Sequence, residues 1–226
     1  MDLLKSAKDT WNNHYSKNML LYPDEEVVRF LNNNRNRKGV GKLIDLGCGS
    51  GRHTVTTLEY GYDVIAVDYA KQCLDTTKAR VDMLGKDATY ILNNDINIPV
   101  EDKSIDVVIA WGCFFCNWRE KIIEFMQEVR RVLKDDGEIF CDFRKQRDDM
   151  YCHSENYGEF IEKDTLLLKR NVPMAGSYLY FTTLEDLKDI VLKAGFTIID
   201  IEQSEFTQKN MTKLNSWYHV VLKKQL

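Results

Sequence analysis

The chain has 226 residues, of which 44% are hydrophobic and 29% charged, with 3 prolines and a formal net charge of -4. This length suits one large domain better than two independent ones, and the composition argues against a long disordered region. The acidic balance argues against nucleic acid as a partner, because phosphate binding depends on clustered Lys and Arg.

The amino-terminal sequence MDLLKSAKDTW lacks the apolar core of a signal peptide, and no long uncharged apolar run follows it. We therefore expect a cytoplasmic protein with no membrane partner. The six cysteines show no disulfide-like spacing, which favours reduced thiols. Cys113 and Cys116 form one CxxC without a second pair or matching histidines, so we expect thiols here and no metal site.

Residues 1–40 are expected to form a helical cap, with a helix over 24–32 that Pro23 introduces. From residue 42 onward, apolar strand patterns alternate with helical ones, which predicts parallel strands joined by helices on both faces of a sheet. The predicted strands are 42–47, 63–70, 88–95, 105–111 and 138–143. The predicted helices between them are 52–61, 71–84 and 121–134.

The alternation stops after residue 143. Residues 144–178 are polar, irregular and rich in Tyr and charge, so we interpret them as an inserted lid or hairpin. A helix over 184–195 and strands over 196–202 and 217–224 follow, and the two strands are expected to pair antiparallel. The predicted fold is one α/β domain over residues 1–226, with a Rossmann-like, seven-stranded, mostly parallel sheet and an antiparallel carboxyl-terminal strand.

The stretch LIDLGCGSGRHT, residues 43–54, places three glycines at alternate positions after a buried strand. Glycine tolerates backbone angles that other residues avoid and lets a ligand approach the main chain. Asp68 ends the second predicted strand, where a carboxylate can accept both hydroxyls of a ribose. Because parallel strands present their carboxyl ends at one edge, the two strand ends together predict a nucleoside site.

The spacing of the glycines is G-x-G-x-G, with Arg52 where a dinucleotide motif would require its third glycine. With Asp45 just before the loop, the stretch resembles the first motif of the class I S-adenosylmethionine-dependent methyltransferases. VIAVDYA is similar to their ribose-binding strand end, and NNDINIPVEDKSIDVVIAWG to the stretch whose acid, here Asp95, meets the adenine edge. EVRRVLKDDGEIF and LEDLKDIVLKAGF resemble the later helix-turn-strand and the final helix.

The resemblance implies S-adenosyl-L-methionine as cofactor, with the loop backbone against its methionine part and Asp45 near its amino group. An amino-terminal aromatic segment, WNNHY, looks like the one that many members fold over the cofactor; alternatively, its aromatic residues are the apolar stripe of a surface helix. The cofactor-binding residues implied in this way are Trp11, Tyr15, Asp45, Gly47, Cys48, Gly49, Gly51, Asp68, Tyr69, Asp95, Ile96 and Trp111.

The reaction implied is methyl transfer, for which the protein must position an acceptor and remove its proton. Candidate catalytic groups are His14, His153 and Tyr22. The mixture of Tyr, His, Arg and acids in 144–178 favours O or N of a small polar molecule, such as a sugar, a sugar nucleotide or a phosphorylated compound, handled by a monomer or homodimer. The alternatives are an RNA or protein methyltransferase, or a non-catalytic cofactor-binding module.

Overall fold

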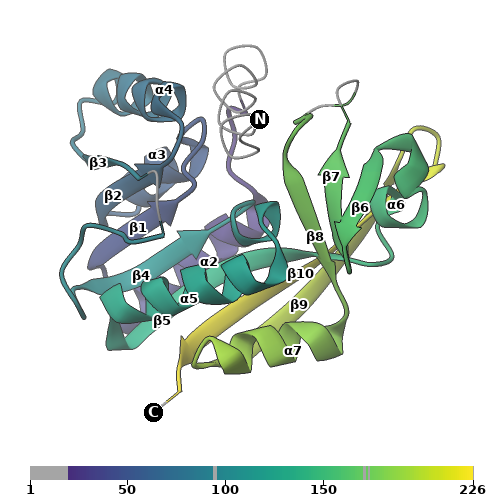
Figure 1. Ribbon diagram of the computed structural model, residues 1–226. Helices are drawn as coiled ribbons and strands as arrows, with labels where there is room; N and C mark the ends of the chain where they lie inside the picture. Colours follow the sequence, from purple (N-terminus) through teal and green to yellow (C-terminus); the bar gives the residue numbers. More distant parts are fainter. Residues whose placement is uncertain (1–19, 94–95, 170–171, 173, 226) are drawn as a thin grey trace.

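The computed structural model describes residues 20–93, 96–169, 172 and 174–225. These residues form a ten-stranded sheet in the order β3-β2-β1-β4-β5-β8-β7-β6, and β10 pairs with both β5 and β9 (Figure 1). The strands are β1 Lys42–Leu46, β2 Asp63–Asp68, β3 Thr89–Leu92, β4 Ile105–Ala110, β5 Leu133–Lys145, β6 Gly158–Glu162, β7 Thr165–Leu168, β8 Tyr178–Thr182, β9 Phe196–Gln208 and β10 Lys213–Lys224.

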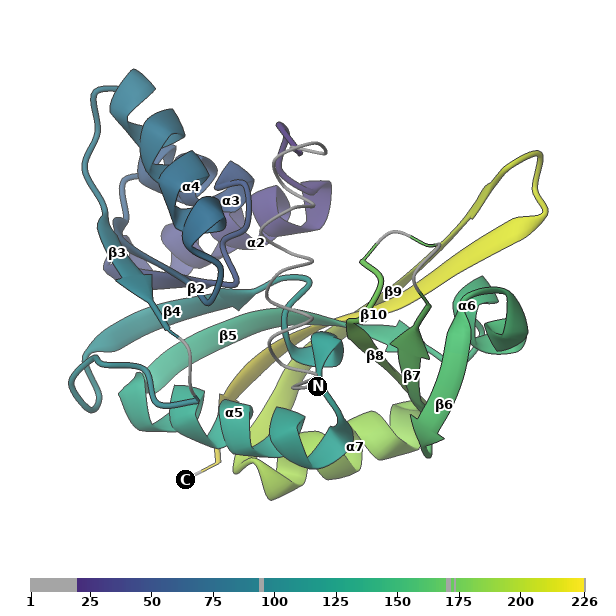
Figure 2. The same cartoon turned by 45° about the horizontal axis from the view of Figure 1, so that its top comes forward.

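Helices cover both faces of the sheet (Figures 1 and 2). One face carries α2 Glu25–Lys38, α3 Arg52–Glu59 and α4 Lys71–Met83, and the other carries α5 Arg119–Val132 and α7 Leu184–Lys193. Short turns of helix follow β4 and β5, namely η1 Phe114–Cys116, α6 Asp149–Cys152 and η2 Ser154–Asn156. Because the central strands are covered twice, β1 and β4 are apolar and almost wholly buried.

The predicted class of fold is confirmed. Strands β1 to β5 pair in parallel, and β10 is antiparallel to both β5 and β9. The sequence patterns misplaced several ends: α2 continues to Lys38, β3 stops at Leu92, and β9 continues to Gln208. These errors lie at exposed ends of helices and strands. There the repeating pattern of apolar residues is a poor guide to where the backbone hydrogen bonds of the element stop.

The segment after β5 adds strands to the sheet. Within residues 144–178, β6 and β7 form an antiparallel hairpin, and β7 then pairs antiparallel with β8. β8 lies parallel to the end of β5 through Arg144 and Lys145. A hairpin was one of the two forms expected for this segment, but the bounds of β6 and β7, strand β8 and their pairing with the main sheet were not predicted, because these apolar runs are short and separated by charged turns.

Among the described residues, no helix combines the length and the apolar character that crossing a membrane requires.

Candidate functional site

The glycine loop joins β1 to α3 at the carboxyl edge of the sheet. Gly47, Gly49 and Gly51 all have positive φ angles, of 73°, 55° and 76°. The backbone N–H groups of Gly47 and Cys48 both donate to the carbonyl of Val67 in β2, at 2.8 and 3.1 Å. The loop is therefore held against the end of the next strand in a conformation that only glycine adopts without strain.

Asp68 lies where β2 ends, directly beside this loop. Its Oδ2 accepts the backbone N–H of Gly49 at 2.9 Å, and its Oδ1 accepts that of Ala70 at 2.8 Å. Burial raises the pKa of Asp68 to about 6, although both hydrogen bonds oppose the shift. Each carboxylate oxygen keeps a further lone pair, so the side chain is fixed in place and still able to accept ligand hydroxyls.

Asp45 lies at the other end of the loop, within β1. Its side chain is 2% exposed, and its Oδ2 accepts the hydroxyl of Thr54 at 2.5 Å. Burial raises the pKa of Asp45, while nearby His53 and the Thr54 hydroxyl partly oppose the shift. This bond ties the end of β1 to the first turn of α3 and so fixes the angle at which the chain leaves the loop.

The end of β4 forms the next wall of the site. A Cβ atom on Gly47 would lie 3.3 Å from both Cβ and Sγ of Cys113, so the loop and the residues after β4 are nearly in contact. Gly112 has a φ of 69°, and a Cβ atom there would meet open space. The half-buried Trp111 precedes it. A bare stretch of backbone beside the glycine loop is what a bound ligand requires.

Gly51 has a second reason to be glycine. It is the residue before α3, and a Cβ atom on it would lie 2.7 to 2.9 Å from three atoms of Thr77 in α4, including its Cα. The Thr77 hydroxyl in turn donates to the carbonyl of Gly49 at 3.2 Å and contacts Sγ of Cys48 at 3.5 Å. Close packing of α3 on α4 thus accounts for Gly51, and Cys48 is buried beneath the loop.

The described part of the amino-terminal region crosses the start of α3. Arg80 in α4 donates to the carbonyls of Leu20 at 3.2 Å, Leu21 at 2.7 Å and Ser50 at 2.8 Å. The Ser50 hydroxyl also donates to the Leu20 carbonyl, at 2.7 Å. One arginine therefore clamps the incoming chain against the glycine loop.

The remaining predicted site residues are distributed differently. Trp11, His14, Tyr15 and Asp95 lie outside the described residues. Tyr69 and Ile96 are half-buried, after β2 and β3 respectively.

Two predicted catalytic side chains are not brought to the glycine loop. Tyr22 is 80% exposed, and only its carbonyl meets Arg52, at 3.3 Å. His153 follows α6, which lies at the opposite side of the molecule from β1 and β2 in both views, and pairs there with Asp149 at 2.9 Å (Figures 1 and 2).

Asp142, at the carboxyl end of β5, is a charged residue that the sequence patterns did not identify as part of the site. Asp142 is 2% exposed and accepts the backbone N–H of Gly112 at 2.7 Å. Arg144, two residues on, lies over the ring of Trp217 with its Cζ 4.0 Å from the ring centroid. The available signal was an acid and an arginine at alternate positions at a strand end, in the segment CDFR.

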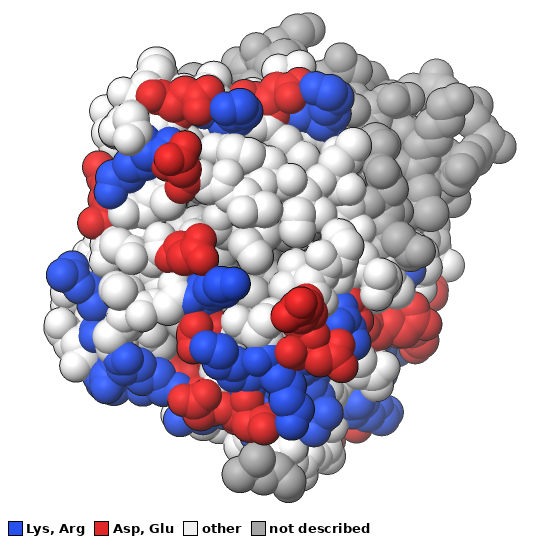
Figure 3. Space-filling model, turned by 90° about the vertical axis from the view of Figure 1, so that its left-hand side faces the viewer, with Lys and Arg blue, Asp and Glu red and all other residues white. Residues whose placement is uncertain are grey.

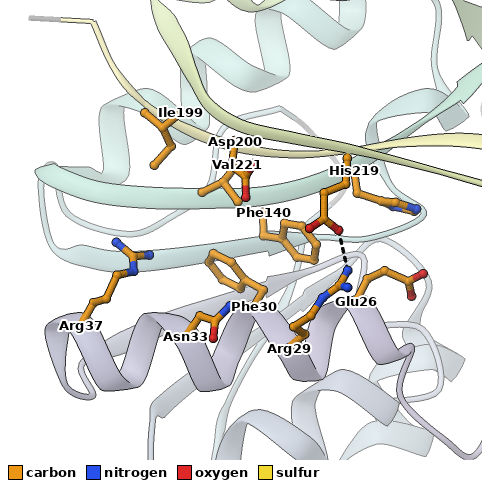
Figure 4. Close-up of a pocket in the computed structure, with 11 residues that line it drawn as sticks. Glu26, Arg29, Phe30, Asn33, Arg37, Phe140, Ile199, Asp200, His219 and Val221 are labelled. Carbon is orange, nitrogen blue, oxygen red and sulfur yellow. Dashed lines mark hydrogen bonds and ion pairs between the residues drawn. The ribbon is translucent and has the colours of Figure 1, made fainter.

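A separate hollow of about 280 Å³ lies between α2 and the strands β5, β9 and β10 (Figure 4). Phe30 and Phe140 stack at 4.7 Å within it, and an ion pair between Arg29 and Glu202 spans one side. Its lining otherwise consists of side chains that join the helix to the sheet.

The residues at the β1, β2 and β4 ends fit S-adenosylmethionine. The backbone at Gly112 leaves room for it, Asp68 presents a fixed carboxylate to ribose hydroxyls, and aromatic rings such as Trp111 suit a sulfonium cation. When bound, the cofactor supplies a methyl group on a positively charged sulfur.

Comparisons with known proteins agree with this geometry. Residues 43–137 match the family model described as a methyltransferase domain. An uncharacterized methyltransferase of Mycobacterium tuberculosis is 29% identical over 153 residues, which cover 66% of this chain and 56% of the relative. A tRNA N(3)-cytidine methyltransferase of Gallus gallus is 23% identical over 197 residues, covering 79% of this chain and 49% of the relative.

Among solved structures, the 1,6-didemethyltoxoflavin-N1-methyltransferase of Burkholderia thailandensis, with bound substrate and S-adenosylhomocysteine, superimposes with a TM-score of 0.64. It is 16% identical and the match covers 90% of this chain and 80% of that one, which shows a shared fold. The chain spans about half the length of the curated relatives it matches. The family model, the fold and the glycine loop together support a methyltransferase domain of the class I S-adenosylmethionine-dependent type over residues 43–137.

Proposed function

We propose that this protein transfers the methyl group of S-adenosylmethionine to an oxygen or nitrogen atom of a small polar acceptor. A sugar, a sugar nucleotide or a phosphorylated compound would fit. The observation that carries the proposal is the position of Arg144 at the carboxyl end of β5, two residues after the strand residue that binds Gly112.

Arg144 is held in a buried setting that suits recognition of an anion or a carbonyl oxygen. Its Nη1 donates to Asp148 at 2.9 Å, and its Cζ lies 4.0 Å and 5.6 Å from the ring centroids of Trp217 and Phe115. Its Nε is buried and has no hydrogen-bond partner among the residues that the structure describes. Since a buried N–H normally finds a partner, this donor is available to an oxygen of a bound acceptor.

The visible surface gives less support to a nucleic-acid acceptor. On the face that includes β3 and the ends of α4 and α5, Lys and Arg alternate with Asp and Glu around an uncharged area (Figure 3). A surface that binds RNA phosphates would gather positive charge in one patch. The net charge of -4 points the same way.

The test is to offer the protein radiolabelled S-adenosylmethionine together with three fractions of one cell extract: metabolites, total RNA and protein. We expect label in the metabolite fraction. Label confined to RNA or to protein would replace the proposal with the corresponding macromolecular acceptor, and no transfer to any fraction despite cofactor binding would indicate a non-catalytic module.

Two arginine variants refine this experiment. Arg144→Gln should lower the transfer rate at least about tenfold, the cost of removing a charged hydrogen-bond donor. Arg147→Gln is the matched control, because the Arg147 side chain is 71% exposed and lies near Glu205 at the surface. Equal rates for the two variants would contradict a role for Arg144 in holding the acceptor.

A further inference from the structure

Asp142 occupies a distinctive position between the glycine loop and the proposed acceptor side. Its carboxylate receives the N–H of Gly112 at 2.7 Å, and Gly112 adjoins Cys113, which a Cβ on Gly47 would nearly touch. Asp142 is thus hydrogen-bonded to Gly112, whose neighbour Cys113 lies beside the glycine loop. On the same face of β5, Arg144 lies two residues further along.

One carboxylate oxygen of Asp142 is held by a hydrogen bond, and the other can still accept one. Oδ1 holds the Gly112 N–H, and this is the one hydrogen bond to its side chain that the described residues show. A Cβ on Gly112 would meet open space, so the approach to the carboxylate passes a residue without a side chain. The second oxygen therefore remains a candidate acceptor for a ligand proton.

We propose that Asp142 is the catalytic base of the methyl transfer, an inference that rests on the proposed function. The acceptor's O–H or N–H bond breaks and its proton moves to Asp142, while the acceptor lone pair forms the new bond to the methyl carbon. The pair of electrons of the broken carbon–sulfur bond stays on sulfur, which becomes the neutral thioether of S-adenosylhomocysteine. Asp142 then releases the proton to water.

The surroundings of Asp142 suit this role. Burial raises the pKa of Asp142 to about 7, with Asp24 adding to the shift and Gly112 and Arg144 opposing it. A base is most effective when its pKa is near the working pH. The other titratable groups around it are Cys141 on its own strand, Cys113 and Cys116 after β4, and His219 opposite on β10.

The first test needs no acceptor. Calorimetry would compare the affinities for S-adenosylmethionine, whose sulfur is positively charged, and for S-adenosylhomocysteine, whose sulfur is neutral, between about pH 5.5 and pH 7.5. An ionised Asp142 near the sulfonium should make the ratio of the two affinities rise about fivefold or more in favour of the cation over this range. Groups near the ribose, such as Asp68, act on both ligands alike and cancel in the ratio.

Two variants accompany this measurement. Asp142→Asn keeps an oxygen for Gly112 and should flatten the ratio, whereas Asp136→Asn on the same strand, with a side chain 85% exposed, should behave as wild type. A flat ratio in the wild-type protein, or an unchanged slope in Asp142→Asn, would overturn the proposal. If Asp142→Asn does not fold, carboxyl-carbon NMR of the wild type answers the same question. The pKa of Asp142 should fall when the cation S-adenosylmethionine binds and should stay unchanged when the neutral S-adenosylhomocysteine binds.

The second test separates a base from a residue that only lies nearby. With the metabolite fraction as acceptor source and saturating S-adenosylmethionine, Asp142→Asn should lower the transfer rate by about 100-fold or more, the usual contribution of a general base, at unchanged affinity for S-adenosylhomocysteine. A full rate in this variant would also overturn the proposal. If the wild-type protein transfers no methyl group to the metabolite fraction, the proposed acceptor class is wrong. The binding test would then still decide whether Asp142 lies near the sulfonium.

Discussion

Trp111 at the end of β4 and His219 in β10 lie face to face, with ring centroids 5.0 Å apart and ring planes 8° from parallel. His219 contacts the hydroxyl of Ser204 in β9 through Nε2 at 2.7 Å, and its buried Nδ1 finds no hydrogen-bond partner within the described part of the chain. The stack therefore connects the wall of the cofactor site to the antiparallel strands β9 and β10. Because the imidazole of His219 is buried, its protonated form is unfavourable.

This arrangement predicts a loss of stability in acid. Burial lowers the pKa of His219 below its ordinary value of 6.5. Below pH 6.5 the unfolded chain therefore binds a proton at this histidine more readily than the folded protein does. The unfolding free energy should then fall with decreasing pH by up to about 1.4 kcal/mol per unit from this residue.

The measurement is urea unfolding of wild type and His219→Phe, which keeps an aromatic ring in the stack, near pH 7.5 and pH 5.5. The wild type should lose more stability than the variant between the two conditions. His153→Gln serves as control, because this side chain is 58% exposed and should follow the wild type. Identical losses in wild type and His219→Phe would contradict the interpretation.

Two of the ion pairs that α2 makes with the sheet differ in burial, which predicts unequal contributions to stability. Glu138 is fully buried in β5 and accepts Arg37 at 2.8 and 3.1 Å and Asn34 at 2.9 Å. Glu202 in β9 pairs with Arg29, and both side chains are about half exposed. Figure 4 shows the second pair at the edge of the hollow.

Glu138→Ala should therefore cost about 2–4 kcal/mol in urea unfolding, because it leaves the buried Asn34 amide and the half-exposed Arg37 guanidinium without their acceptor, whereas Glu202→Ala should cost less than about 1 kcal/mol. Although burial opposes it, Arg37 holds the pKa of Glu138 below its ordinary 4.5, so this stabilisation is complete above that pH and is lost as the pH falls further. Equal costs for the two variants would be inconsistent with the burial of Glu138.

The sequence predicted features that depend on neighbouring residues and missed those that join distant segments. The apolar runs of β1, β2 and β4 identified the sheet, and glycines with an acid after the second strand identified the cofactor edge, because both signals are local. Glu138 and Arg37 are 101 positions apart, and no local pattern joins them. Asp142 was missed for the same reason, because its partner Gly112 follows a different strand 30 positions earlier.

Gly51 and Gly85 offer a comparison for the role of the glycine loop in packing. Both have positive φ angles, of 76° and 62°, but a Cβ on Gly51 would collide with Thr77 while one on Gly85 would meet nothing within 4 Å. Both alanine variants should lose about 1–2 kcal/mol for the positive φ angle. Gly51→Ala should lose about 1–3 kcal/mol more through overpacking.

Urea unfolding of the two variants measures this difference directly. Thr77→Ser should not rescue Gly51→Ala, because the Cα of Thr77 is itself 2.9 Å from the added atom. Should Gly51→Ala be as stable as Gly85→Ala and lose cofactor affinity alone, Gly51 would serve the ligand and not the contact between α3 and α4.

Asp68 gives the most direct test of the cofactor site. Its two oxygens are fixed by Gly49 and Ala70, so a ribose placed there donates its hydroxyls to a carboxylate that cannot turn away. Asp68→Ala should weaken S-adenosylmethionine and S-adenosylhomocysteine alike by about 1.5–3 kcal/mol, the worth of hydrogen bonds to a charged group. Asp75→Ala is the control, since that carboxylate lies on α4 with 54% of its side chain exposed.

The pH dependence of this affinity distinguishes a binding role from a purely structural one. Because burial raises the pKa of Asp68 to about 6, the carboxylate is charged above that pH and neutral below it. Affinity for S-adenosylhomocysteine should therefore fall as the pH drops from about 7.5 to 5, and the fall should be absent in Asp68→Ala. Using the neutral thioether keeps Asp142 out of the measurement, so a pH-independent affinity in the wild type would remove Asp68 from the ribose site and leave it as the residue that holds the glycine loop.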